Sequence, residues 1–159
     1  GKILNSAALS TGKMTLCKQD IKVQQLMDDS YKSVIDVANH RNVTLQWNID
    51  ADVHVFCDLK MITQALINLM VNAIKYSPAG GIIQVSANTS GAGCLLSIAN
   101  TLELSDQAST ALPSVYDSVG FGLEIVETIL EAHETGLQVI KTETDFKAGF
   151  VLNTHDTAS

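Results

Sequence analysis

The segment at residues 64–78 reads QALINLMVNAIKYSP, and it combines an apolar helical stripe with two asparagines, a lysine and a tyrosine. The apolar positions recur at steps of three and four, which is the spacing of an amphipathic helix. A buried amide that lacks a hydrogen-bond partner costs roughly 2–7 kcal/mol, so the polar side chains of this segment need partners. The stripe is formed by Ile62, Leu66, Leu69, Met70 and Ala73.

Three polar residues share one side of this predicted helix. Asn68 and Asn72 are four positions apart and Lys75 follows three positions later, so they lie on one face. An asparagine offers an oxygen to a hard cation such as Mg²⁺, and a lysine donates hydrogen bonds to phosphate. With the apolar side packed on a sheet, this face would line a cleft. The alternative is that it is the solvent-facing side of an ordinary amphipathic helix.

The limits of the helices are marked by residues with strong positional preferences. Asp58 is a good N-cap for the helix that follows it. Ser77 precedes Pro78, and a residue before proline is pushed out of the helical region. A second amphipathic helix is predicted from Lys22 to Asn39, and a third from Gly122 to Ala132.

Short alternating runs of apolar and polar residues predict the strands. The runs at 82–87 and 94–99 are expected to pair antiparallel, and those at 137–144 and 149–154 to form a second hairpin. Residues 101–119 have no clear period and are predicted to be a loop. Such strands with helices on one face make an α+β, two-layer sandwich with a mixed, mostly antiparallel sheet. The remaining strands are expected at residues 13–20, 42–49 and 53–56.

Composition limits the classes of function. The chain has 159 residues, of which 46% are hydrophobic, enough for the core of one domain. Its apolar runs fall short of the ~20 residues that a membrane-spanning helix needs. The formal net charge of −7 disfavours non-specific nucleic-acid binding, which depends on basic side chains. Three cysteines without CxxC spacing argue against a zinc site and fit reduced thiols in the cytosol.

The segment at residues 64–78 resembles the N-box of sensor histidine kinases, members of the nucleotide-binding superfamily shared with gyrase, Hsp90 and MutL. SVGFGLEIVETILEAHETG, at residues 118–136, resembles the G2 box and the helix after it. LSTGKMTLCKQDI, at residues 9–21, resembles the end of a dimerisation helix that runs into the catalytic domain. The resemblance implies a dimerisation-helix tail and linker at 1–12 and a catalytic domain with the Bergerat-type ATP-binding fold at 13–159.

The resemblance also implies roles for the N-box residues. Asn72 would coordinate the Mg²⁺ that bridges the phosphates of ATP. Asn68, one turn earlier, would help to hold the metal or its water. Lys75 and Tyr76 would contact phosphate or the lid over the site.

The G2 glycines receive a role from the same resemblance. Gly120 and Gly122 would let the backbone approach the phosphates at the start of the helix that begins near Leu123, where free N–H groups favour anions. The alternative is that these glycines only form a tight turn from loop to helix.

The G1 box departs from the family pattern of an aspartate followed by two alternating glycines. Asn100 stands at the aspartate position, where its amide oxygen would accept from the adenine amino group, but without a charge. Leu102 and Leu104 replace the glycines, so the loop would be reshaped where glycine permits unusual dihedral angles. Ser118 replaces the first glycine of the G2 box.

The charge of the following span also departs from the family. No lysine or arginine occurs between Tyr76 and Ile140. Histidine kinases often supply a basic residue to the phosphates from this region, and losing one charge-assisted hydrogen bond costs about 1.5–3 kcal/mol. Mg²⁺ and Lys75 would offset part of this loss. The span instead carries Glu103, Asp106, Asp117, Glu124, Glu127, Glu131 and Glu134.

The resemblance implies an enzyme that transfers the γ-phosphoryl group of Mg-ATP to a histidine. None of His40, His54, His133 and His155 is placed like the family's acceptor, so the acceptor is expected upstream or on another subunit. The implied partners are the protein's own dimerisation domain and a response regulator. The parent would be a homodimer in which this is a cytoplasmic domain, with or without a membrane anchor.

Two alternatives to this enzyme remain. The G1 substitutions and the acidic span favour a pseudokinase or regulatory module of the same fold, with weak or no ATP binding. Another member of the superfamily, such as an anti-sigma-type kinase, is disfavoured by the helix tail expected at residues 1–12.

Overall fold

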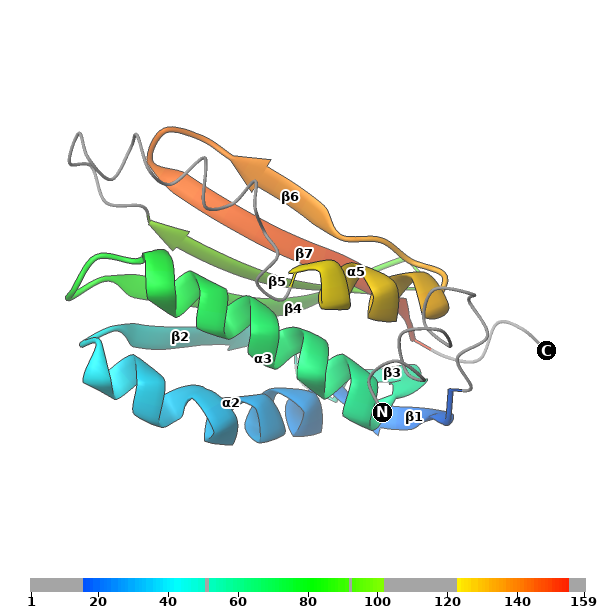
Figure 1. The fold of residues 1–159 in the computed structure, drawn as a ribbon. Helices are drawn as coiled ribbons and strands as arrows, with labels where there is room; N and C mark the ends of the chain where they lie inside the picture. Colours follow the sequence, from blue (N-terminus) through cyan, green and yellow to red (C-terminus); the bar gives the residue numbers. More distant parts are fainter. Residues whose placement is uncertain (1–15, 51, 92, 102–122, 155–159) are drawn as a thin grey trace, which may run out of the picture.

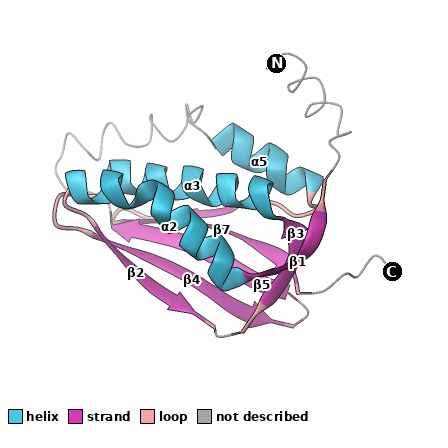
Figure 2. Cartoon of the chain, turned by 90° about the horizontal axis from the view of Figure 1, so that it is seen from below, coloured by secondary structure: helices cyan, strands magenta, loops and turns pink. Residues whose placement is uncertain are grey.

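The computed structural model describes residues 16–50, 52–91, 93–101 and 123–154. The helices are α2 (Val23–His40), α3 (Leu59–Tyr76) and α5 (Leu123–Ala132). The strands are β1 (Lys18–Lys22), β2 (Thr44–Ile49), β3 (His54–Asp58), β4 (Ile82–Ser90), β5 (Gly93–Thr101), β6 (Gln138–Lys141) and β7 (Asp145–Asn153). The described helices cover one face of the main sheet, as Figure 1 and Figure 2 show from two sides.

The main sheet has five strands in the order β2-β4-β5-β7-β6. Strand β2 runs parallel to β4, whereas the other neighbouring strands are antiparallel. Strands β1 and β3 form a separate two-stranded antiparallel sheet. The predicted fold class, an α+β two-layer sandwich with a mixed and mostly antiparallel sheet, is therefore confirmed.

The core lies between the sheet and the helices. Val85, Ile98 and Ala148 are neighbours in register on β4, β5 and β7, and all three are buried. Side chains alternate between the two faces of a strand, so Leu96 and Phe150 belong to this same face and are 0% exposed. The sheet thus presents a continuous apolar surface to the helices.

Helix α3 lies between α2 and α5 and packs against both (Figure 1). Ile62, Leu66, Met70 and Ile74 follow one another at steps of four and are fully buried. Burial of each such side chain contributes about 1.5–3 kcal/mol, so this stripe is a major source of stability. It also fixes the rotation of α3 and hence the direction of its polar residues.

Most of the predicted elements agree with the structure, with small shifts at their ends. The helices predicted at 22–39 and 122–132 correspond to α2 and α5, and the strands predicted at 42–49, 82–87 and 94–99 to β2, β4 and β5. The strand predicted at 53–56 is β3, and the one predicted at 13–20 is β1, which continues further because it pairs with β3 as far as Lys22.

The C-terminal hairpin is present, but the predicted strand limits were wrong. Strand β6 stops at Lys141, and β7 already begins at Asp145. The reason is a tight turn closed by Thr142, whose Oγ1 accepts from the N–H groups of Thr144 and Asp145 at 3.3 and 3.0 Å. Hydroxyl groups that bond to nearby backbone in this way favour turns over strands.

Two further expectations concern the rest of the chain. The helix tail predicted at residues 1–12 and the loop from residue 102 onward lie outside the described residues, while Thr101 is the last residue of β5. Within the residues that the structure does describe, no helix is both long enough and apolar enough to cross a membrane.

Candidate functional site

Helix α3 is held at its start by Asp58, the residue predicted to be its N-cap. One carboxylate oxygen, Oδ1, accepts from the Met61 N–H at 3.1 Å, which satisfies a donor that has no partner within the first turn. The other oxygen, Oδ2, accepts from the Cys17 N–H at 2.9 Å. Asp58 therefore confirms the capping prediction and also joins α3 to the chain that enters β1.

His133, directly after α5, contacts the same point. Its Nε2 accepts from the Asp58 N–H at 3.1 Å, and its Nδ1 donates to the Ile129 carbonyl at 2.8 Å. Burial lowers the pKa of His133, and the Lys18 charge acts in the same direction, while the bond to Ile129 and the Asp58 charge oppose it. The ring therefore links the end of α5 to the start of α3, a contact across 75 residues that sequence analysis missed.

The N-box residues lie at different depths. Asn72 is buried, with 7% exposure. Asn68 is half-buried, and its Oδ1 accepts from Gln64 Nε2 at 2.9 Å. Lys75 is exposed, whereas Tyr76 is half-buried, and burial raises the pKa of its phenol. Of the three residues on the predicted polar face, Asn72 is buried, Asn68 is half-buried and Lys75 is exposed, so the face is neither fully buried nor fully exposed.

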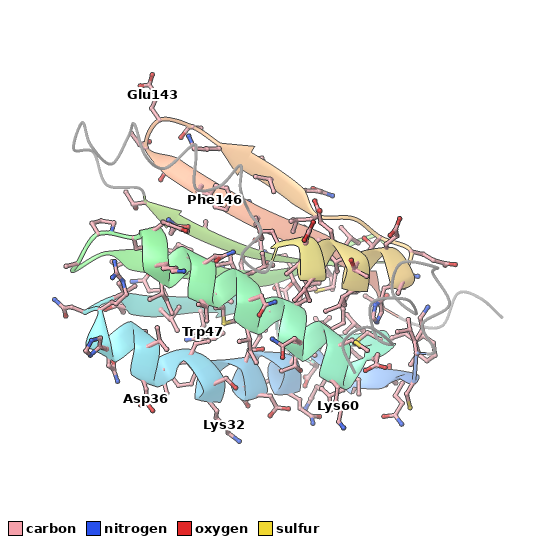
Figure 3. All side chains as sticks on the ribbon, viewed as in Figure 1. Lys32, Asp36, Trp47, Lys60, Glu143 and Phe146 are labelled. Carbon is pink, nitrogen blue, oxygen red and sulfur yellow. The ribbon has the colours of Figure 1, made fainter. Side chains whose placement is uncertain are left out.

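Asn100 lies near the end of β5, on the face of the sheet that meets the helices. It pairs in register with Ile83 on β4 and with Phe146 on β7, the residue labelled in Figure 3, and it is 3% exposed. Its Nδ2 donates to the Thr101 carbonyl at 3.2 Å. Its Oδ1 is buried and has no hydrogen-bond partner in the described part of the chain.

The orientation of this amide follows from its one hydrogen bond. If the amide of Asn100 were reversed, two oxygens would face each other across the contact to Thr101, so the oxygen is the open end. A buried acceptor without a partner costs about 1–3 kcal/mol, and such an atom requires an explanation. A ligand that donates a hydrogen bond at this position would remove the cost.

The G2 region is only partly described. Leu123 is the first residue of α5 and is 9% exposed. Gly120 and Gly122 lie outside the described residues, and so do the substituted positions Leu102, Leu104 and Ser118. Helix α5 packs on α3, so the beginning of the G2 helix and the N-box helix belong to neighbouring elements (Figure 2).

A hollow of about 370 Å³ lies beside Asn100 but differs from the predicted site. Gln84 and Ala99, two of its lining residues, are paired in register and belong to the sheet face away from the helices. Neither Asn72 nor Lys75 lines it. The full lining is Ile82, Gln84, Ala99, Asn100, Thr101 and Asp145. This hollow therefore belongs to the outer side of the sheet.

The donor set near Asn72 suits a divalent cation only together with a ligand. Across the described ranges, no three or more His, Cys, Asp or Glu side chains gather as a metal site. Mg²⁺ is typically held by few protein oxygens, with phosphate oxygens and waters completing its octahedral shell. The side-chain amide oxygen of Asn72, a residue that is 7% exposed, would fit this arrangement as one ligand among several.

Comparison with known proteins identifies the fold and finds relatives in sequence. No family model matches the chain. The chain is 30% identical over 135 residues to the sensor histidine kinase ZraS of Escherichia coli, covering 80% of this chain and 29% of ZraS. The histidine kinase AdeS of Acinetobacter baumannii shares its fold, with a TM-score of 0.77 at 18% identity over 94% of this chain and 74% of that chain. The chain is therefore similar in sequence to part of sensor histidine kinases and has the fold of histidine kinase catalytic domains.

A second solved structure extends the comparison of the fold. Full-length ShkA in complex with AMPPNP gives a TM-score of 0.77 at 18% identity, over 99% of this chain and 36% of that chain. The domain spans about 30% of the length of the curated relatives it matches.

The structure brings together three of the elements on which site residues were predicted. Asn72 lies on α3, Asn100 on β5 and Leu123 at the start of α5. Helix α3 packs on both β5 and α5. A long-range arrangement of this kind cannot be obtained from spacing along the chain, because these residues lie on three different elements that are far apart in the sequence.

Proposed function

We propose that this domain binds Mg-ATP and transfers the γ-phosphoryl group to a histidine on a dimerisation domain. The observation that carries the proposal is the buried, open Oδ1 of Asn100, which needs a donor that a bound ligand would supply. The sequence similarity to sensor histidine kinases supports it, and so does AMPPNP, an ATP analogue, in the structure of ShkA.

The base of the nucleotide would lie beside β5. The exocyclic amino group of adenine would donate to Asn100 Oδ1. Guanine carries a carbonyl oxygen at the corresponding position, which would face the amide oxygen with no proton between them. The Thr101 carbonyl holds Nδ2, so the amide would not reverse to accept guanine. ATP is therefore expected to bind at least about tenfold more tightly than GTP, since one buried polar pair is mismatched with GTP.

The phosphates would extend along α3. Mg²⁺, when bound, would neutralise charge on the phosphate oxygens, and the Asn72 oxygen would be a protein ligand to it. Asn68 would hold a coordinated water, and the Lys75 ammonium would donate to a phosphate. The first backbone N–H groups of α5, from Leu123 onward, have no acceptor within the helix and favour an anion nearby.

The transfer itself would use few chemical groups of the protein. The bond between phosphorus and the β–γ bridging oxygen would break, a bond from phosphorus to a histidine nitrogen would form, and ADP would leave. Positioning and charge neutralisation account for most catalysis of this type. The acceptor histidine, the response regulator, the homodimeric state and the cytoplasmic location of the parent are parts of this proposal.

A regulatory module without phosphoryl transfer is the second candidate. One observation favours it: the first turn of α5 carries Glu124, whose carboxylate would repel a phosphate at this helix end. The leucines at positions 102 and 104 also favour a regulatory module, because they replace glycines of the nucleotide loop.

Titration with a fluorescent ATP analogue, with and without Mg²⁺, tests the proposal. We expect saturable, Mg²⁺-dependent binding that Asn72→Ala weakens on the order of tenfold or more, the loss expected for one charge-assisted contact. Asp36→Asn is the control, because Asp36, labelled in Figure 3, is exposed on α2, a helix that carries none of the proposed site residues. Absence of binding to the folded domain at millimolar nucleotide would favour the regulatory module instead.

A further inference from the structure

The side chain of Arg41 connects the turn after α2 to the last turn of α3. Its Nε donates to the Ile74 carbonyl at 3.2 Å, and its Nη2 donates to the Lys75 carbonyl at 3.1 Å. The last four carbonyls of a helix receive no hydrogen bond from backbone N–H groups of the same helix. A further one of these carbonyls, that of Ala73, accepts from Ser77 Oγ at 2.8 Å. The guanidinium also places a positive charge at the negative end of the helix dipole.

The turn that carries Arg41 is itself fixed to the turn that follows α3. The Asn42 carbonyl accepts from the Gly80 N–H at 2.7 Å, and the Thr44 N–H donates to the Gly81 carbonyl at 3.0 Å. Asn42 has a φ of 59°, a left-handed conformation that asparagine adopts more readily than most residues. The parallel pairing of β2 with β4 begins at Thr44. The guanidinium is therefore attached to a backbone that cannot easily move relative to α3.

The choice of arginine has a geometric reason. Its planar guanidinium carries several N–H donors in a rigid fork and can bond two successive carbonyls, whereas a lysine ammonium is a compact point donor on a flexible stem. Arg41 is the single arginine of the sequence. The two carbonyls that it holds belong to the helical turn from which Lys75 projects, one turn after Asn72.

We infer that Arg41 is a positioning residue that fixes the last turn of α3 and so directs the Lys75 ammonium toward the phosphates of the nucleotide. The inference rests on the proposed function, because it is the nucleotide that Lys75 meets. Arg41 itself does not touch the nucleotide and acts through the backbone of Ile74 and Lys75.

Affinity for the fluorescent ATP analogue in the presence of Mg²⁺ tests the role in Arg41→Met and Arg41→Lys. Arg41→Met should bind on the order of tenfold more weakly. Arg41→Lys should recover less than half of this loss, because lysine restores the charge but not the fork. Lys32→Met is the matched control: Lys32 is an exposed base on α2 that Figure 3 shows extending away from α3, and its loss should leave affinity unchanged.

A double-mutant cycle separates positioning from a general loss of stability. If Arg41 acts through Lys75, Lys75→Met costs much less affinity in the Arg41→Met background than in the wild type, because contacting residues are not additive. Equal losses in the two backgrounds would overturn the inference. Full recovery of affinity by Arg41→Lys would do so as well, since charge alone would then explain the effect.

Hydrogen exchange without nucleotide tests the contact itself. In Arg41→Met, the backbone amides of residues 74–77 should exchange about tenfold faster, while the middle of α3 keeps its protection. The inference is overturned if the exchange rates in Arg41→Met are unchanged. It is also overturned if the last turn of α3 exchanges faster in this variant but the affinity for the ATP analogue is unchanged. If the wild type binds no nucleotide, the proposed function fails and the positioning role falls with it, whereas failure in the variants alone leaves the proposed function intact.

Discussion

Position 100 holds an asparagine whose Nδ2 donates a hydrogen bond and whose Oδ1 has no partner among the described residues. In the absence of a ligand, the open Oδ1 of Asn100 costs the folded domain about 1–3 kcal/mol. An ionised aspartate at the same buried position would cost more, because burying an unpaired charge is more expensive than burying an amide. If Asn100 has the proposed role, it would supply an acceptor for the base at a lower cost than an aspartate at this position.

Replacement of Asn100 by leucine should separate stability from binding. Leucine has a similar shape and removes both the open oxygen and the bond to Thr101, so we expect a free energy of unfolding that is unchanged or higher by about 1 kcal/mol. Affinity for the ATP analogue should fall on the order of tenfold or more. Urea denaturation and nucleotide titration measure the two effects, with Asn88→Leu on the exposed part of β4 as control. A destabilised variant with unchanged affinity would contradict this role of Asn100.

Residues with local partners were predictable, and residues with distant partners were not. Asp58 could be identified as an N-cap because its partner, Met61, is three positions away. Arg41 could not be identified, because its acceptors lie 33 and 34 positions further along. The roles of Asn68, Asn72, Lys75 and Tyr76 remain predictions that came from the resemblance of the N-box.

Helix α3 is the element that both the core and the proposed site depend on, and it is secured at both ends. The repeat of apolar residues in the sequence predicted α3 correctly, because one side of this helix is buried. Strand β6 shows the opposite case, since all four of its residues are exposed. Without a buried face, alternation in the sequence did not indicate where β6 ends, and only the bonds of Thr142 do so.

Removal of the N-cap should weaken α3 from its start. Asp58→Ala loses the bonds to the Met61 and Cys17 N–H groups, so we expect the free energy of unfolding to fall by about 1–2 kcal/mol. Asp58→Asn should lose less, because asparagine is also a good N-cap. Urea denaturation followed by the fluorescence of Trp47, which packs edge-on against Tyr31 on α2, measures the change. Equal stability of Asp58→Ala and the exposed control Asp36→Ala would show that the cap contributes nothing.

Hydrogen bonds among His133, Asp58 and Cys17 connect three parts of the described chain that are far apart in the sequence. Through these three residues the chain entering β1, the start of α3 and the end of α5 share one hydrogen-bonded network. The network depends on a neutral imidazole, because Nε2 must accept from the Asp58 N–H. Protonation of the ring would replace this acceptor with a donor that faces another donor.

This requirement makes the stability of the folded domain depend on pH. Burial lowers the pKa of His133 below that of a histidine in the unfolded chain. Between these two pKa values the unfolded state binds a proton that the folded state does not, so the free energy of unfolding decreases as the pH falls. The contribution is fully present above the ordinary histidine pKa of ~6.5 and is lost progressively below it. Asp58 and Lys18 are the charged groups that face the ring, with opposite effects on its pKa.

The free energy of unfolding of the wild type should therefore be lower at pH 5 than at pH 7.5. His133→Gln should reduce this difference, because glutamine can accept from the Asp58 N–H through its amide oxygen but cannot take up a proton. At pH 7.5 the same variant should be less stable than the wild type on the order of 1 kcal/mol, since the two bonds of the ring are imperfectly replaced. His40→Gln, at the exposed end of α2, is the matched control and should keep the full difference. If His133→Gln loses as much stability on acidification as the wild type, the pH dependence comes from other groups. The network at Asp58 would then have no role in the pH dependence.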